Sequence, residues 1–464
     1  MKIDRSRLPT PAPVRAFTFP RVEKSILPNG LRVWTVTHAA LPIVSLLLLV
    51  SRGSATDPPG QEGLAAMTTD MLDEGSGSRS AIEIHEDLAR IGAQFDNDIG
   101  TDAAVLSMTA LSRFADRALM LLGDMAARPA LTEADVQRVR QLRLHRLTQL
   151  RDVPSAVADR TFARLLYGHH PYGHTPIGNE RSVAALGVDD VRAFHARKIR
   201  PNATTLLAVG DCDHRQIERL ASEAFAGWEG ASLRDADVVS SEAVIPSFGQ
   251  ADENGAGRLY VVPRPGAPQS ELRIGHVAVD RFTADYHALV AANMILGGQF
   301  VSRINANLRE DKGFTYGART SFEFRRLPGP FALQVSVQTA ATGRAIEESF
   351  GEIAAIRGPR PPTDEELAVG VAALTRGFAK NFETADQIAR ATSQMALYDL
   401  PDDYYAEYVP IIERVTTADV TRVTADHIDP ARLITLIVGD LDAIAGDLPG
   451  LGLGEPIVLS PEGF

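Results

Sequence analysis

Apolar positions along the chain form short continuous runs separated by longer stretches with helical spacing. The run from Ile43 to Val50 is apolar except for Ser45, and its length suits a buried strand. Helical spacing recurs in four later stretches, at 64–72, 81–91, 115–127 and 133–150, and 95–111 resembles a pair of strands. Strands interrupted by long helices are typical of helices packed on an antiparallel sheet, so we expect an α+β fold.

The same pattern occurs twice in the sequence. Val191–Asp211 reads VRAFHARKIRPNATTLLAVGD, and 229 residues later, without a gap, Val420–Asp440 reads VTRVTADHIDPARLITLIVGD. Each copy contains a helical stretch, a proline, an apolar strand and then Val-Gly-Asp. A second pair of strands, preceded by Pro42 and Pro268, lies at the nearly equal offset of 226 residues. Two matches at almost one offset predict a duplicated chain.

The duplication predicts two homologous α+β domains, each an antiparallel sheet packed with helices. We place them at residues 20–235 and 255–445. The segment 233–257 is polar, contains Gly and Asp, and has little periodicity, so we interpret it as the linker between the domains.

Composition narrows the classes of partner. The 464 residues are too many for one core, and 45% hydrophobic with 23% charged residues is a globular balance. The net charge of -12 argues against nucleic acid and anionic membranes. No apolar run is long enough for a membrane span, and the single Cys212 excludes an internal disulfide. Residues 1–20 lack a signal-peptide core, so we expect a cytoplasmic protein, or a periplasmic one if a signal peptide was removed.

Three motifs then follow one another along the chain. Gly53–Leu72 reads GSATDPPGQEGLAAMTTDML, His170–Gly173 reads HPYG, and Leu308–Gly317 reads LREDKGFTYG. As an ordered set, they resemble the pitrilysin, insulysin and mitochondrial processing peptidase family of zinc metallopeptidases. The resemblance covers residues 20–445 and agrees with the duplicated halves.

Active members of this family carry H-x-x-E-H on their first long helix, where two His bind zinc and the Glu acts as general base. The matching positions here hold Ala66, Thr69 and Asp70. The family's third ligand is a Glu on a later helix, and its place falls near Arg146. No acidic residue lies between Asp135 and Asp152, and the helix instead carries arginines that repel a cation and could pair with Asp70: Arg138, Arg140, Arg143, Arg146 and Arg151.

The resemblance therefore implies that this chain holds no metal. The alternative is a zinc site built from other residues. His169, His170 and His174 occur together, but the intervening proline and glycine prevent a helix, and His85 has no second His one turn away. We expect the 169–174 segment to be a loop that packs under the sheet.

The third motif keeps the family's Arg and Tyr at Arg309 and Tyr316. In the family these two side chains hold the substrate carbonyl and stabilise the negative oxygen that forms when water attacks it. Two structural alternatives stay open: a surface salt bridge from Arg309 to Glu310 or Asp311, and a half-buried strand aromatic at Tyr316.

We thus expect a non-catalytic subunit of a two-chain zinc endopeptidase. This chain would supply Arg309 and Tyr316, and a homologous partner subunit in a heterodimer would supply the zinc. The substrate would be a peptide or unfolded protein, added as a strand to a sheet edge near 96–105. The alternatives are a structural scaffold subunit of the same fold and a peptide-binding module without chemistry.

Overall fold

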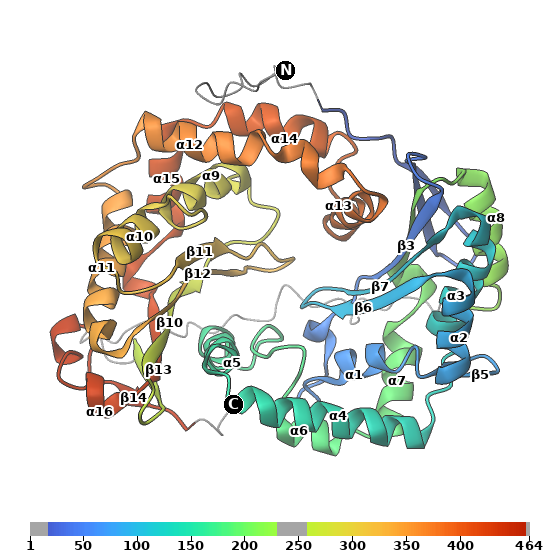
Figure 1. The fold of residues 1–464 in the computed structure, drawn as a ribbon, viewed down its shortest axis with the longest axis horizontal. Coiled ribbons are helices and arrows are strands. Elements are labelled where there is room, and N and C mark those ends of the chain that lie inside the picture. Colours follow the sequence, from blue (N-terminus) through green and yellow to red (C-terminus); the bar gives the residue numbers. More distant parts are fainter. Residues whose placement is uncertain (1–16, 230–257, 461–464) are drawn as a thin grey trace, which may run out of the picture.

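Two similar halves make up the fold (Figure 1), and the computed structural model describes residues 17–229 and 258–460. The first half is coloured blue to green, and the second is coloured yellow to red. The predicted linker at 233–257 lies outside the described residues. Within the described ranges, no helix combines the length and apolarity needed to cross a bilayer.

The first half is built on a six-stranded sheet whose central strand, β3, is the predicted apolar run. Neighbouring strands are antiparallel except for β2 and β8, which are parallel because the intervening helices form a crossover between them. In order across the sheet, the strands are β1 (Glu23–Ile26), β2 (Arg32–Thr37), β8 (Thr204–Gly210), β3 (Ile43–Val50), β7 (Ala104–Leu111) and β6 (Gln94–Ile99).

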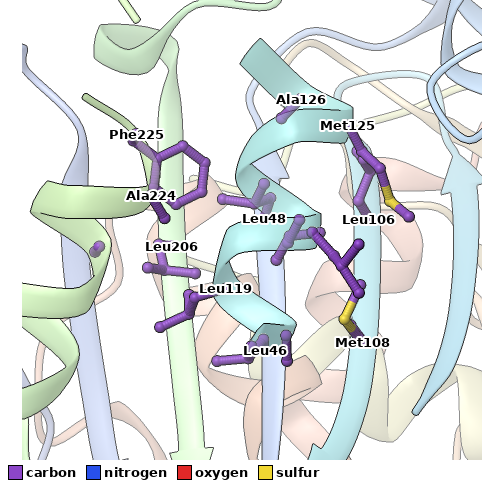
Figure 2. Close-up of a cluster of buried hydrophobic side chains, with 14 of the residues drawn as sticks. Leu46, Leu48, Leu106, Met108, Leu119, Met125, Ala126, Leu206, Ala224 and Phe225 are labelled. Atoms are coloured by element: carbon purple, nitrogen blue, oxygen red, sulfur yellow. The ribbon is translucent and has the colours of Figure 1, made fainter. Parts of the chain in front are cut away.

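Alternation along the strands of this sheet gives it two apolar faces. Leu46 and Leu48 of β3 and Leu106 of β7 point to one side, where α3 and α8 cover them with Leu119 and Phe225 (Figure 2). The helices of this half are α1 (Leu64–Asp70), α2 (Ala81–Ile91), α3 (Ala115–Ala127), α4 (Glu133–Arg151), α5 (Pro154–Tyr167), α6 (Glu180–Ala185), α7 (Val188–Lys198) and α8 (His214–Ala224), with a short β4–β5 ribbon (Gly75–Ser76, Arg79–Ser80).

The second half repeats this sheet. Its strands in order are β11 (Ala318–Phe322), β12 (Pro330–Gln338), β10 (Gln269–Val277), β13 (Ile434–Gly439), β9 (Leu259–Pro263) and β14 (Ile457–Val458). Its helices are α9 (Tyr286–Leu296), α10 (Arg303–Asn305), α11 (Thr342–Ile356), α12 (Asp364–Thr375), α13 (Ala385–Tyr398), α14 (Tyr404–Glu413), α15 (Thr417–His427) and α16 (Leu441–Ile444). A single π-helical turn, η5 (Ala306–Asp311), and a short 3-10 helix, η7 (Phe378–Phe382), complete it.

Strand register confirms the repeat seen in the sequence. Leu46 of β3 lies opposite Ala208 of β8, and at the predicted offsets Leu272 of β10 lies opposite Ile437 of β13. The α+β class is confirmed. The sheets are mixed rather than wholly antiparallel, because β9 also pairs in parallel with both β13 and β14.

One helix of each half packs on the sheet of the other half. Helix α13 packs on β3 and β8 through Ile388 and Met395, which join Leu47 and Val209 in one buried cluster. Reciprocally, α5 packs on β10 and β13 (Figure 1), and Phe162 and Leu436 belong to one buried cluster. The limits 20–235 and 255–445 stay a prediction for the sequence, and in space the exchanged helices cross that division.

Candidate functional site

The helix at the degenerate zinc motif, α1, is anchored at its start by a buried carboxylate. Asp57 accepts hydrogen bonds from the backbone N–H groups of Gly63 (2.8 Å) and Ala65 (2.6 Å), and His174 Nε2 lies 3.1 Å from it. Gly63 has φ 97°, and a Cβ there would lie 2.9 Å from the carbonyl oxygen of Ile177. Burial raises the pKa of the Asp57 carboxyl, and the contact with His174 offsets part of that rise.

The three motif positions on α1 are closed off from solvent or already paired. Ala66 and Thr69 are buried, and the Thr69 hydroxyl donates to the carbonyl of Ala65 at 2.9 Å. Asp70 Oδ2 accepts from Arg143 Nη1 at 2.6 Å. Burial raises the pKa of the Asp70 carboxyl, and the Arg143 guanidinium partly offsets the rise.

Arg143, and not Arg146, pairs with Asp70, while the placement of the family's third ligand near Arg146 stays a prediction. Arg143 falls in the same row of α4 as the buried Val139 and Leu147, at intervals of four residues. Arg146 precedes Leu147 by one residue, so it lies about 100° further around the helix and is exposed. The predicted pairing of Asp70 with an arginine of this helix is therefore present, through Arg143.

The residues around α1 do not fit a zinc ion. A catalytic zinc takes three protein ligands, and the described part of the chain contains no group of three His, Cys, Asp or Glu side chains placed to hold a metal. The only carboxylate among the three motif positions already accepts from a guanidinium, whose charge opposes a cation.

The HPYG loop lies in the first half and forms hydrogen bonds at its contact with the second half. His170 Nδ1 accepts from the backbone N–H of Tyr172, and the Tyr172 hydroxyl donates to Asp102 at 2.6 Å. The tip of the β11–β12 hairpin completes the junction, since Leu327 N–H donates to Tyr172 and Arg326 N–H donates to Asp102. Burial lowers the pKa of His170. The loop packs on the second-half sheet, as part of the cluster that contains α5.

Arg309 and Tyr316 line one open hollow of about 580 Å³ at the start of β11, the edge strand of the second sheet. The Arg309 guanidinium stacks on Phe300 at 3.3 Å, and its Nε donates to Glu310 at 2.8 Å. Tyr316 is 93% exposed. Asn305 fixes the wall behind them, because its side chain exchanges two hydrogen bonds with the backbone of Ala318.

The structural alternatives for this pair are resolved differently. The salt bridge from Arg309 to Glu310 is present. The half-buried aromatic at Tyr316 is wrong, because its ring projects from the surface. All described residues that line the hollow belong to the second half, so no first-half side chain completes this site. The predicted peptide edge near 96–105 includes β6, which lies at the edge of the first sheet.

Sequence reasoning missed two features of these sites. It did not single out Asp102, whose only signal was its place in the turn between two predicted strands. It also did not choose among the five arginines, although the buried spacing of Val139 and Leu147 pointed to Arg143 as the partner of Asp70.

Comparisons with known proteins agree with this architecture. Two family models match adjoining parts of the chain: Insulinase (Peptidase family M16) over residues 32–178, and Peptidase M16 inactive domain over residues 185–374. The first includes α1 and the HPYG loop. The second includes the hollow with Arg309 and Tyr316.

Relatives and solved structures extend the likeness over most of the chain. A protein of Mycobacterium bovis described as an uncharacterized zinc protease is 26% identical over 314 residues, 68% of this chain and 69% of the relative. Another so described, from Streptomyces coelicolor, is 24% identical over 64% of this chain and 63% of its own length.

Among solved structures, a peptidase M16 inactive domain from Pseudomonas fluorescens superposes with TM-score 0.81 at 24% identity, covering 90% of this chain and 98% of that one. A protease from Helicobacter pylori gives TM-score 0.80 at 19% identity, with 90% and 99% covered. These two structures support the fold. With two adjoining family models that together span most of the chain, the protein belongs to peptidase family M16, the insulinase family.

Proposed function

We propose that this chain is the non-catalytic subunit of a two-chain zinc endopeptidase. A homologous partner subunit would carry the metal and the general base. This chain would supply Arg309 and Tyr316 to bind the substrate carbonyl and to stabilise the negative charge that develops on its oxygen.

The observation that carries the proposal is the contrast between the two motif regions of one chain. The α1 region is filled by the Asp70–Arg143 pair, so it offers no place for a metal. The second-half hollow is open, and Tyr316 projects from it with 93% of its surface exposed. A tyrosine that no described residue covers is free to reach a substrate held by another subunit.

The chemistry of the pair suits an oxyanion. A guanidinium presents several N–H donors in one plane, and a phenol adds a single O–H donor. In the free chain the Arg309 Nε and Nη2 atoms face Glu310, while its ring contact with Phe300 fixes the plane of the guanidinium. Its remaining N–H groups are the ones left for a carbonyl oxygen.

A scaffold subunit of the same fold is the second candidate. The hydrogen bonds from Tyr172 and from the backbone of Arg326 to Asp102 favour it, because they hold the two halves together and involve no catalytic chemistry. The open hollow with Arg309 and Tyr316 favours the peptidase subunit instead, because a purely structural subunit has no need for a donor pair that lines an open hollow.

The test is peptide turnover by this chain alone, by a zinc-bearing homologue alone, and by the two mixed. Gel filtration follows their association, and elemental analysis after dialysis measures zinc in this chain. We expect turnover only in the mixture, with zinc substoichiometric in this chain. Association without any gain in turnover would favour the scaffold, and turnover by this chain alone would overturn both candidates.

A further inference from the structure

A second hollow of about 580 Å³ lies between the two halves, away from the hollow that contains Arg309. One wall is the inner face of the first sheet, with Asp96 and Asp98 of the edge strand β6 and Ser107 of β7. The other walls come from the second half: helices α13 and α14, and Arg281 from the loop that follows β10. The hollow therefore adjoins the sheet edge at which a peptide strand would add.

Arg281 is the charged group most deeply set in this hollow. Its residue is only 9% exposed, and its guanidinium lies 3.6 Å from the centre of the Tyr286 ring. Its Nη2 donates to the Tyr404 hydroxyl at 2.6 Å. The backbone N–H of Arg281 donates to the carbonyl of Arg325, which holds the loop in place.

Among the described residues, no carboxylate lies within 4.0 Å of the Arg281 guanidinium. Every other arginine of the second half with so little exposure is paired in this way: Arg273 with Asp159 and Glu271, and Arg303 with Glu366. A buried cation without a counter-charge is unfavourable, and aromatic faces compensate it only in part. Arg281 thus has an unmet preference for an anion.

The positive charge of Arg281 affects the pKa of neighbouring side chains. The pKa of His287 is lowered to about 4, first by burial and then by the charge of Arg281. Burial raises the pKa of Tyr404 and Tyr408, and Arg281 opposes that rise at both. His287 Nε2 is itself buried without a hydrogen-bond partner among the described residues.

The remaining charges of the hollow restrict what the anion can be. Arg390 is occupied by Asp386, with 3.0 Å between Nε and Oδ2. Asp96 and Asp98 line the first-half wall, so a multiply charged anion such as phosphate would meet two carboxylates as well as one free guanidinium. A single carboxylate, which an arginine binds through two parallel hydrogen bonds, fits this balance better.

We propose that Arg281 and the Tyr404 hydroxyl form a binding site for one carboxylate of a peptide, either its C-terminus or an Asp or Glu side chain. The site would anchor an extended peptide beside β6. The inference rests on the proposed function only in taking a peptide as the ligand. It requires no partner chain and no cleavage.

The test measures binding of fluorescein-labelled alanine-rich decapeptides to the full chain by fluorescence anisotropy at pH 7. Four probes separate the two sources of carboxylate: a free C-terminal acid, its C-terminal amide, an amide with one central Glu, and an amide with Gln at that position. We expect either the free acid or the Glu peptide to bind roughly tenfold or more tighter than its neutral match, because hydrogen bonds to charged groups are strong.

Variants assign the preference to the hollow. Arg281→Gln and Tyr404→Phe should each reduce that tenfold preference, and Arg281→Lys should retain only part of it because the planar fork is lost. Arg390→Gln is the matched control in the same hollow, where the arginine is already paired, and should keep the preference. Circular dichroism checks that Arg281→Gln folds, and Tyr404→Phe tests the site if it does not.

Equal binding of acid and neutral probes, or a preference that survives both Arg281→Gln and Tyr404→Phe, would overturn the site. So would failure of all four probes to bind at millimolar concentration. Loss of cleavage in Arg309 or Tyr316 variants has no bearing on this result, so the carboxylate site and the proposed peptidase role fail independently.

Discussion

The regions around α1 and around β11 differ in whether their polar groups are satisfied within the chain. In the first half, Asp57 and Asp70 are paired with His174 and Arg143. In the second half, Tyr316 is almost fully exposed, and Arg309 has only its exposed neighbour Glu310 as an acidic partner. Because buried polar groups must be paired, the carboxylates around α1 have partners within the chain, whereas an exposed side chain such as Tyr316 can stay without one.

The largest effect is expected from removing the donor groups of Arg309 and Tyr316. Arg309→Ala and Tyr316→Phe should each lower turnover by the assembled pair roughly a hundredfold or more, since removal of one oxyanion donor costs ~2.7–4 kcal/mol. The melting temperature should change little in Tyr316→Phe, because that side chain is exposed, whereas Arg309→Ala also removes a largely buried side chain and should lower it more. Arg344→Ala is the control, because Arg344 is an exposed arginine that also stacks on a phenylalanine, Phe314, outside the hollow. Full turnover in both variants would leave the scaffold as the better account.

The second sheet should lose stability in acid through one buried histidine. His276 of β10 is buried, accepts from the N–H of Asp429, and occupies the place that Val50 holds in β3. Burial lowers the pKa of His276 to about 4, so the unfolded chain binds this proton more readily than the folded chain. The stabilisation is complete above the unfolded pKa of ~6.5 and is lost as pH falls toward 4, by up to about 3 kcal/mol.

Urea unfolding at pH 7, 5.5 and 4.5 would measure this loss. His276→Val gives the second sheet the residue of the first and should reduce the dependence on pH, leaving the part that other buried histidines such as His287 contribute. Val50→Ala is the control, because it weakens the first sheet without changing a titratable group. The same pH dependence in wild type and His276→Val would show that acid acts elsewhere in the fold.

The interaction between Asp70 and Arg143 can be tested by a double-mutant cycle. Arg143→Ala leaves the partly exposed Asp70 without its partner, and Asp70→Ala leaves a nearly buried guanidinium with only the carbonyl of Pro176. Each change should lower the free energy of unfolding by about 1–3 kcal/mol, and the double variant should lose less than the sum. Arg146→Ala should fall within about 0.5 kcal/mol of wild type, because that side chain is exposed. Additive losses would mean that the two side chains do not interact in solution.

The smallest effect is expected from rebuilding the metal site. Ala66→His, Thr69→Glu and Asp70→His restore the motif on α1, but Arg143 still faces it. Adding Arg143→Glu should raise zinc affinity by at least roughly tenfold, the lower range for a change around a metal site. Adding Arg146→Glu instead should not, since Arg146 lies on another side of α4. Isothermal titration with zinc distinguishes the two, and a larger gain from Arg146→Glu would restore the register first expected from the sequence.

Much of the fold could be predicted because it is encoded locally or by repetition. The apolar run at β3, the helix periods and the common offset of the two copies are all properties of neighbouring residues or of two aligned segments. The exchange of α5 and α13 could not be predicted, because their periodicity shows that each has an apolar face without showing which sheet that face covers. The parallel pairs involving β8 and β9 depend in the same way on long-range topology.

The sequence names candidate site residues, whereas their geometry depends on the fold. Ala66, Thr69 and Asp70 follow from the motif, and their inability to bind zinc follows from their chemistry. The choice between Arg143 and Arg146 depends on how α4 is rotated against α1. The exposure of Tyr316 and the deep position of Arg281 depend on contacts between segments far apart in the sequence.

The reciprocal placement of α5 and α13 has a consequence for the origin of the molecule. If the two halves were separated, each would contain one helix whose apolar face has no sheet to pack on, and one sheet face that no helix covers. A single ancestral copy could have met both needs as a symmetric dimer in which each protomer lent this helix to its twin. Gene fusion would then have turned a swapped dimer into one chain, and only afterwards could the sequences of the two copies diverge.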